Sequence, residues 1–84
     1  MVSVSITRKY FRYVLKRYRE QRKMTQGILS KLVGVSTSFY GMMETGRKWP
    51  NIDMLFRIAD ALKVPPAEMI AALDAERKRA TRLE

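Results

Sequence analysis

Residues 25–44, TQGILSKLVGVSTSFYGMME, constrain the fold of this chain more than any other stretch. Thr25 can cap a short helix, because a threonine hydroxyl accepts a hydrogen bond from a free N–H of the first helical turn. Gly34 stands where this helix must end in a sharp turn, and Ser36 can cap a second short helix that ends at Gly46. Three apolar residues of the first of these helices are expected to point inward: Ile28, Leu29 and Leu32. The pattern therefore predicts two short helices joined by a tight turn.

The segments on either side also carry apolar residues at i, i+3, i+4 and i+7, the spacing of one helix face. One such stripe predicts a helix over roughly residues 7–22, which Ser5 or Thr7 can cap: Phe11, Val14, Leu15 and Tyr18. A second stripe predicts a fourth helix, capped by Asn51: Leu55, Ile58, Ala59 and Leu62. Val2, Val4 and Ile6 alternate with serines, but five residues at a terminus are weak evidence for a strand.

Pro65 and Pro66 are expected to end the fourth helix and begin a fifth, because proline suits only the first turn of a helix. The fifth helix is expected to turn three residues inward: Ala67, Ile70 and Leu73. We therefore predict one all-α domain of about five helices over residues 1–84. Its core is expected within about residues 7–73, its paired short helices within about 25–45, and its C-terminal helix and tail over 66–84.

Length and composition exclude several classes of function. The chain has 84 residues, enough for one small domain, and contains no Cys and no His. Disulfide frameworks, zinc fingers, thiol nucleophiles and imidazole bases are therefore excluded, and we expect no enzyme, metal or cofactor. No apolar run approaches the ~20 residues of a membrane span, and the N-terminal residues lack the apolar region and cleavage site of a signal peptide, so we expect neither feature. The expected location is the cytoplasm, with no membrane partner.

The charge of the chain is strongly positive and unevenly placed. Seventeen Lys and Arg face eight Asp and Glu, which gives a formal net charge of +9. Residues 1–48 hold eleven basic and two acidic side chains, so all of the excess lies there, and residues 49–84 are neutral overall. A basic half of this kind predicts a polyanionic partner, nucleic acid before an anionic membrane surface.

Two short helices joined by a glycine turn are the sequence form of a helix-turn-helix, whose second helix enters the DNA major groove. Further residues follow in a fixed order along the chain: Leu15, Arg19, Thr25-Gln26, Leu29, Gly34-Val35-Ser36, Glu44, Gly46, Pro50, Leu55, Ile58-Ala59, Ala61-Leu62 and Val64. This set resembles the lambda-repressor/Cro-like (XRE) family of DNA-binding domains, and the resemblance covers Leu15 to Glu68. It implies a compact five-helix fold that binds double-stranded operator DNA as a small transcriptional regulator.

The resemblance assigns roles to individual positions. It implies base contacts from four residues: Gln26, Thr37, Ser38 and Met42. It implies phosphate contacts from three more: Phe39, Arg47 and Lys48. Arg19 and Glu44 are expected to form a structural ion pair between the first and third helices. The chemistry agrees, because hydroxyl groups hydrogen-bond several base edges, and Met42 offers an apolar contact for a thymine methyl.

Three positions depart from the family pattern. Ser30 replaces the usual Ala, which a packed turn accepts if the hydroxyl bonds back to a carbonyl. Tyr40 replaces a buried aliphatic residue, and its ring and that of Phe39 either fill the core or lean on the DNA backbone. Gly41 weakens the middle of the reading helix by ~1 kcal/mol relative to Ala, unless it permits close approach to the groove.

One helix-turn-helix reads few base pairs, so such proteins generally bind DNA in pairs. We expect a homodimer through the neutral C-terminal half, where Met54 and Phe56 lie off the main stripe of the fourth helix and the fifth helix offers an apolar edge of Met69, Ile70, Leu73 and Ala80; the alternative is that some of these residues complete the core. The regulator is expected to serve phage, plasmid, restriction or toxin–antitoxin control, with a regulatory protein as a possible partner. The alternative is a protein-interaction adaptor that docks partners through Phe39, Tyr40 and Met42.

Overall fold

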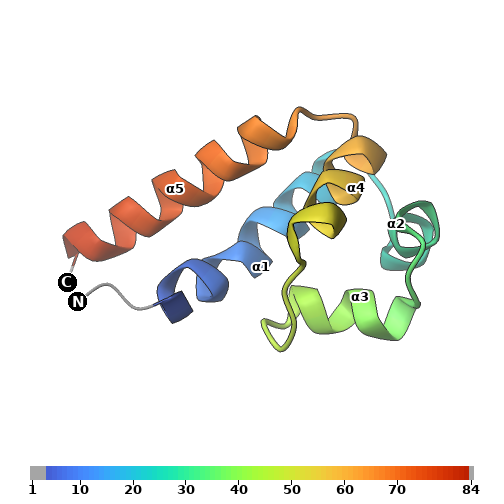
Figure 1. The fold of residues 1–84 in the computed structure, drawn as a ribbon, viewed down its shortest axis with the longest axis horizontal. Coiled ribbons are helices and arrows are strands. Elements are labelled where there is room, and N and C mark those ends of the chain that lie inside the picture. Colours follow the sequence, from blue (N-terminus) through green and yellow to red (C-terminus); the bar gives the residue numbers. More distant parts are fainter. Residues whose placement is uncertain (1–3, 84) are drawn as a thin grey trace.

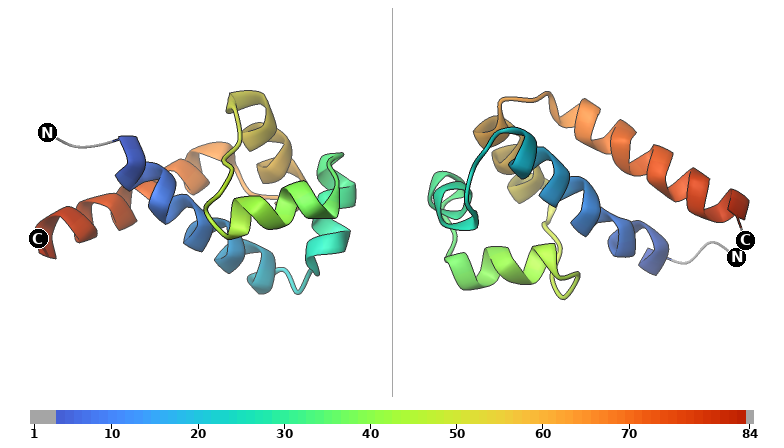
Figure 2. Two further views of the ribbon diagram at one scale, coloured as in Figure 1. Left: turned by 90° about the horizontal axis from the view of Figure 1, so that it is seen from below. Right: turned by 180° about the vertical axis from the view of Figure 1, so that it is seen from behind.

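The computed structural model describes residues 4–83 and folds them into helices joined by short turns, with no strand in this range (Figure 1). The elements are α1 (Val4–Gln21), α2 (Gln26–Val33), α3 (Thr37–Glu44), α4 (Ile52–Leu62) and α5 (Pro66–Leu83). The two long helices, α1 and α5, run side by side, whereas α3 lies along one edge of the molecule (Figure 2). The predicted all-α architecture of five helices is confirmed.

The predicted caps define the three short helices. Thr25 Oγ1 accepts a hydrogen bond from the Ile28 N–H at 3.0 Å, and Ser36 Oγ accepts one from the Phe39 N–H at 3.0 Å. At the start of α4, Asn51 Oδ1 accepts a bond from the Met54 N–H at 2.8 Å. Each cap satisfies one of the free donors of a first turn, which explains why these helices begin at these residues.

The predicted start of α1 is wrong. The helix begins at Val4, so Ser5 and Thr7 lie within it rather than capping it. The alternating β-branched residues of this segment lower helix propensity only slightly, and they do not prevent the helix from extending. Val2, also part of that alternation, lies outside the described residues.

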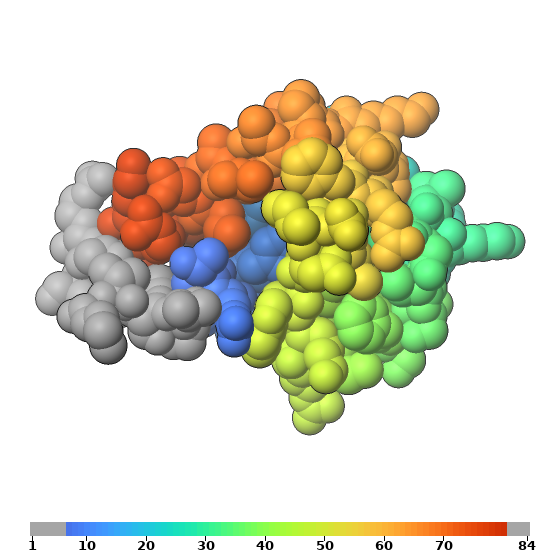
Figure 3. Space-filling view, in the orientation of Figure 1, coloured from blue at the N-terminus to red at the C-terminus, as the bar shows by residue number. Residues whose placement is uncertain are grey.

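One contiguous core forms where all five helices meet. Its buried members come from every helix and from Val64 in the α4–α5 turn: Phe11, Val14, Leu15, Leu29, Val33, Tyr40, Met43, Ile58, Ala59, Leu62, Val64 and Met69. Three of the four residues are buried in each of the stripes predicted for the first and the fourth helix, and the remaining two, Tyr18 and Leu55, pack partly buried against the core. In the space-filling view, α4 packs directly against α2 (Figure 3).

Two inward faces were predicted wrongly. On α2, Ile28 and Leu32 are 51% and 58% exposed, because the helix buries Leu29, Ser30 and Val33 instead. The face is turned by one residue because α2 packs between α3 and α4 and buries only a narrow strip.

On α5, Met69 is buried, whereas Ile70 is 46% exposed and Ala67 is exposed too. Leu73 packs partly buried against the core, as predicted. Met69 is therefore not available for the predicted dimer surface, because α5 uses it to contact the core.

Candidate nucleic-acid interface

The turn between α2 and α3 is tight and closed by backbone hydrogen bonds. The N–H groups of Gly34 and Val35 both donate to the carbonyl oxygen of Ser30, at 2.9 and 3.0 Å. Gly34 has φ +88°, a left-handed conformation that glycine adopts without steric cost. This turn sets α3 across the end of α2 and leaves Thr37 and Ser38 exposed at the start of α3.

Beneath α3, three side chains converge on one carboxylate. Glu44 accepts hydrogen bonds from Arg19 Nε at 2.6 Å and Arg19 Nη2 at 3.0 Å, so the expected ion pair forms in a two-pronged geometry. Gln26 Nε2 donates to the same carboxylate at 3.0 Å, and the Tyr40 hydroxyl donates to it at 2.5 Å. We call Arg19, Gln26, Tyr40 and Glu44 the Glu44 cluster. It ties α1, α2 and α3 together.

The cluster holds Glu44 in its charged form. Burial acts to raise the pKa of Glu44, but hydrogen bonds from Arg19, Tyr40 and Gln26 outweigh it, and the pKa lies below its usual value. The hydrogen bonds that Arg19 donates to Glu44 also raise the pKa of Arg19. Burial, and then the bond to Glu44, raises the pKa of the Tyr40 hydroxyl far above its usual value, so Tyr40 remains a donor.

Tyr40 and Ser30 show how the chain accommodates its departures from the family pattern. The Tyr40 side chain is fully buried, so its ring fills the core. Ser30 is 2% exposed, and its hydroxyl donates to the Gly27 carbonyl oxygen at 2.8 Å, the back-bond that a buried serine requires. The full burial of Tyr40 also removes the largest ring from the docking surface on which the adaptor alternative depends.

Two of the predicted base-contact residues are held by intramolecular bonds. Gln26 is partly buried, and one of its amide hydrogens is used by Glu44. Thr37 Oγ1 lies 3.1 Å from Ser30 Oγ, and since Ser30 donates to Gly27, Thr37 is the donor of this pair. Ser38 is exposed, and Met42 is partly buried. The Ser30–Thr37 contact is a link that the sequence pattern did not reveal.

The predicted phosphate-contact residues lie in different surroundings. Arg47 and Lys48 are exposed directly after α3, and both of their N–H groups donate to the Met42 carbonyl oxygen, at 2.9 and 3.1 Å. Phe39 is partly buried against the core. The structure therefore presents the two cations to solvent at the end of α3, while the Phe39 ring is largely used in packing.

Sequence reasoning did not single out Arg12, which supports this turn from α1. Its Nη1 donates to the Thr45 carbonyl oxygen at 3.2 Å, and its Nη2 donates to the Tyr13 hydroxyl at 2.6 Å. A side chain at Gly46, where φ is +82°, would lie only 3.2 Å from Arg12 Cδ. Arg12 stood among many basic residues of the first helix, so only the three-dimensional contact distinguishes it.

Trp49 follows the same turn and is 43% exposed. The Arg8 guanidinium lies 4.0 Å from the centre of its ring, a cation–π contact between α1 and the α3–α4 loop.

Among residues 4–83, no three Asp or Glu side chains gather as a metal site. None of the helices in this range is long and apolar enough to cross a membrane.

A helix-turn-helix family model matches residues 15–69, well over half of the chain. The chain belongs to this family. The family is that of XRE-type regulators, so the protein is a DNA-binding transcription regulator, and neither the family nor the similar structures are enzymes. No curated protein matches the chain.

Solved structures repeat the fold. The clp gene regulator ClgR from Corynebacterium glutamicum is 19% identical, with a TM-score of 0.84 over 92% of this chain and 82% of that one. The restriction-modification controller protein C.AhdI from Aeromonas hydrophila is 27% identical, with a TM-score of 0.67 over 70% of this chain and 86% of that one. The controller protein C.Esp1396I, a tetramer in complex with its natural 35 base-pair operator, is 21% identical, with a TM-score of 0.75 over 90% and 97% of the two chains.

Proposed function

We propose that this regulator recognises one specific operator with α3 in the major groove and controls a nearby promoter in a phage, plasmid, restriction-modification or toxin–antitoxin module. The observation that supports this best is the Glu44 cluster, which fixes α3 to α1 and α2 with four hydrogen bonds to one carboxylate. A rigid support of this kind is what a base-reading helix requires, because base contacts depend on fixed geometry. Such a regulator acts where the DNA is, in the cytoplasm.

Four side chains are proposed to read base edges: Gln26, Thr37, Ser38 and Met42. Glu44 accepts a bond from one amide hydrogen of Gln26. The Oε1 atom of Gln26 and its second amide hydrogen therefore remain for a base edge or a phosphate. Thr37 uses its hydrogen on Ser30 and presents its oxygen as an acceptor, suited to an amino group of adenine or cytosine. Met42 is proposed to contact a thymine methyl.

Arg47, Lys48 and the exposed edge of Phe39 are proposed to contact the DNA backbone. The two cations supply the salt-dependent part of the affinity. The start of α2, at Gln26, and the start of α3, at Thr37, present N–H groups and a positive dipole end that attract phosphate. Phe39 packs against the core, so only its outer edge is offered to a sugar.

Selection of bound DNA from a random duplex library tests specific recognition. At ~150 mM salt, where non-specific phosphate binding is weak, we expect enrichment of a two-fold symmetric motif. Replacement of Thr37 and Ser38 by Ala is expected to change the enriched bases, whereas replacement of Lys63, on the α4–α5 turn, leaves the motif intact. Failure to enrich any motif would reject specific binding.

We further propose a homodimer through α4 and α5, with half-sites about one helical turn apart. Large apolar side chains are exposed on both helices: Ile52 at 63%, Phe56 at 48% and Ile70 at 46%. Exposed apolar residues of this size commonly mark interaction surfaces. C.Esp1396I, which is a tetramer on its operator, has the same fold, and this supports an assembly of several copies.

Sedimentation of the free protein and of its DNA complex tests the dimer. We expect Phe56→Glu together with Ile70→Glu to produce monomers and to weaken operator binding. Ile28→Glu, an equally exposed position on α2, is the matched control and should leave the assembly unchanged. A monomer at micromolar concentration, both free and on operator DNA, would reject the dimer.

A further inference from the structure

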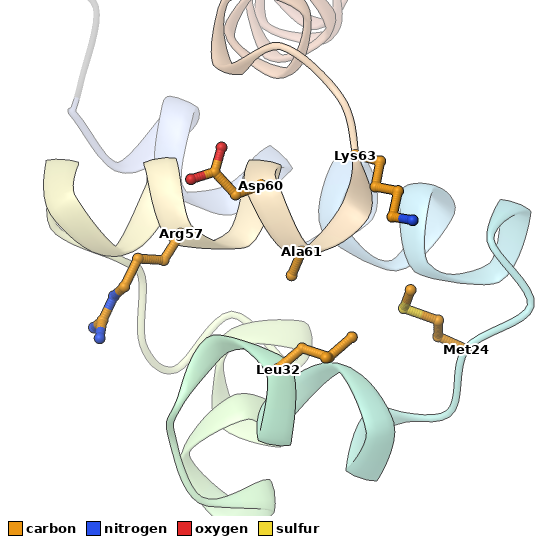
Figure 4. Close-up of a pocket in the computed structure, with 6 residues that line it drawn as sticks. All are labelled: Met24, Leu32, Arg57, Asp60, Ala61 and Lys63. Carbon is orange, nitrogen blue, oxygen red and sulfur yellow. The ribbon is translucent and has the colours of Figure 1, made fainter.

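The predicted DNA surface leaves one large groove of the protein unused. It lies between α2 and α4, has a volume of about 640 Å³, and is lined by Met24, Leu32, Arg57, Asp60, Ala61 and Lys63 (Figure 4). Its volume falls in the range of sites that bind a side-chain cluster or a small ligand.

The floor of this α2–α4 groove is apolar. Leu32 is 58% exposed, and Figure 4 shows Ala61 pointing from α4 toward it, with Met24 beside them. Ile28, one turn earlier on the same face of α2, is 51% exposed and extends the apolar strip. These neighbouring aliphatic side chains form a contiguous apolar strip, and a strip of this kind beside a groove is suited to contact with another molecule.

The ends of the groove are positively charged. Arg57 extends at one end and Lys63 at the other, while the Asp60 carboxylate points away from Leu32 (Figure 4). Within the described part of the chain, neither Arg57 nor Lys63 forms an ion pair. The groove therefore offers apolar contacts in the middle and free cations at both ends.

DNA bound to α3 leaves this groove open. Three of the proposed base-reading residues belong to α3, and the fourth, Gln26, is the first residue of α2, whereas the groove is lined by Leu32 near the other end of α2 and by residues of α4. A molecule seated in it is therefore compatible with a protein that already holds its operator.

We propose that the α2–α4 groove docks a short amphipathic helix of an acidic partner protein. Apolar residues at i and i+4 of that helix contact Leu32 and Ala61, and its flanking carboxylates pair with Arg57 and Lys63. Charge complementarity favours an acidic partner, because Arg57 and Lys63 at the ends of the groove form no ion pair within the described residues and the partner's carboxylates would neutralise them.

The probe is a fluorescently labelled synthetic peptide of ~15 residues, long enough for a marginal helix, with Leu at i and i+4 flanked by Glu. We expect saturable binding by fluorescence anisotropy, with amide NMR shifts centred on α2 and α4. Arg57→Glu with Lys63→Asn should weaken it about tenfold, and Asn tolerates the left-handed backbone at Lys63, where φ is +58°. Lys16→Glu with Lys9→Gln, the same charge change on α1, is the matched control and should leave the affinity unchanged.

Three results would overturn the proposal. A peptide with Ala in place of Leu that binds equally well would show attraction to any polyanion. NMR shifts centred on α3, or displacement of the peptide by operator DNA, would place it on the DNA surface. Concentration-dependent shifts at Leu32 and Ala61 in the protein alone would assign the groove to self-association.

Thermal unfolding of each variant checks that it folds. Leu32→Ala, at an exposed position, is a second variant that we expect to weaken peptide binding.

Discussion

Glu44 is the residue on which the fold and the proposed reading helix both depend. Its side chain is only 3% exposed and that of Arg19 only 12%, so removal of the carboxylate strands a buried cation. We expect Glu44→Ala to lower the free energy of unfolding by about 3–5 kcal/mol, the usual cost of breaking a buried pair. Urea unfolding measures it. Asp74→Ala removes a carboxylate that is 42% exposed, and should cost far less. Equal losses in the two variants would contradict this account.

The lowered pKa of Glu44 predicts a pH dependence of stability with a definite sign. Because the pKa is lower in the folded chain than its ordinary value of 4.5, the stabilisation is complete above that value and is lost as pH falls through the folded pKa. The difference in unfolding free energy between the natural protein and Glu44→Gln should therefore shrink below about pH 4.5. Urea unfolding from pH 7 to pH 3 measures it, and a constant difference over this range would contradict the prediction.

Two glycines of the α3 region are expected to respond in opposite ways to substitution. Gly46 has φ +82°, and a Cβ there would lie 3.2 Å from Arg12 Cδ, so Gly46→Ala should destabilise by at least about 1 kcal/mol. Gly41 lies inside α3, and its Cβ would lie 3.6 Å from Gln26 Oε1, an ordinary contact. Gly41→Ala should stabilise by about 0.5–1 kcal/mol. Thermal unfolding compares them. A lower operator affinity of a stabilised Gly41→Ala would support close approach of DNA at this position.

At the scale of the element, α2 shows how a helix can be predicted correctly while its buried face is not. We expect Ile28→Ser to change stability by less than about 1 kcal/mol, because the side chain is 51% exposed. Leu29→Ala, at a fully buried neighbour, should cost about 2–5 kcal/mol. Chemical denaturation of the two variants checks this. A larger loss for Ile28→Ser than for Leu29→Ala would mean that the predicted face, rather than the one in the structure, is the buried one.

The starts of the three short helices were predictable because they depend on local chemistry, whereas the start of α1 was not. Thr25, Ser36 and Asn51 each cap a helix with their own side chains, and Gly34 ends one with its own backbone conformation. The exposure of Leu32 was not predictable in the same way. It depends on how α2 is rotated about its axis where it packs against α3 and α4. The spacing of apolar residues within α2 does not determine that rotation.

The site was predictable to the same limited extent. The Arg19–Glu44 pair followed from the family pattern, but the bonds from Gln26 and Tyr40 to the same carboxylate did not. Neither did the contact between Thr37 and Ser30, because it requires knowledge of how α3 lies against α2. These bonds decide which atoms of Gln26 and Thr37 remain free for DNA, so the structure sharpens the chemistry of a site whose position the sequence already indicated.

At the scale of the whole molecule, the charge separation makes a quantitative prediction. The excess of +9 lies in residues 1–48, and Arg47 and Lys48 are its exposed members at the end of α3. Each phosphate contact contributes a slope of about −0.9 to log K against log salt. Arg47→Gln with Lys48→Gln should therefore flatten the slope of operator binding by about 2 per protomer.

The matched control for that measurement comes from the neutral half of the chain. Arg57→Gln with Lys63→Asn removes two exposed cations from α4 and its C-terminal turn, which lie outside the proposed DNA surface. Its salt slope should equal that of the natural protein, although its net charge falls by the same amount. If both variants flattened the slope equally, the affinity would depend on total charge, and the assignment of phosphate contacts to the end of α3 would be wrong. If neither did, Arg47 and Lys48 would not touch phosphate at all.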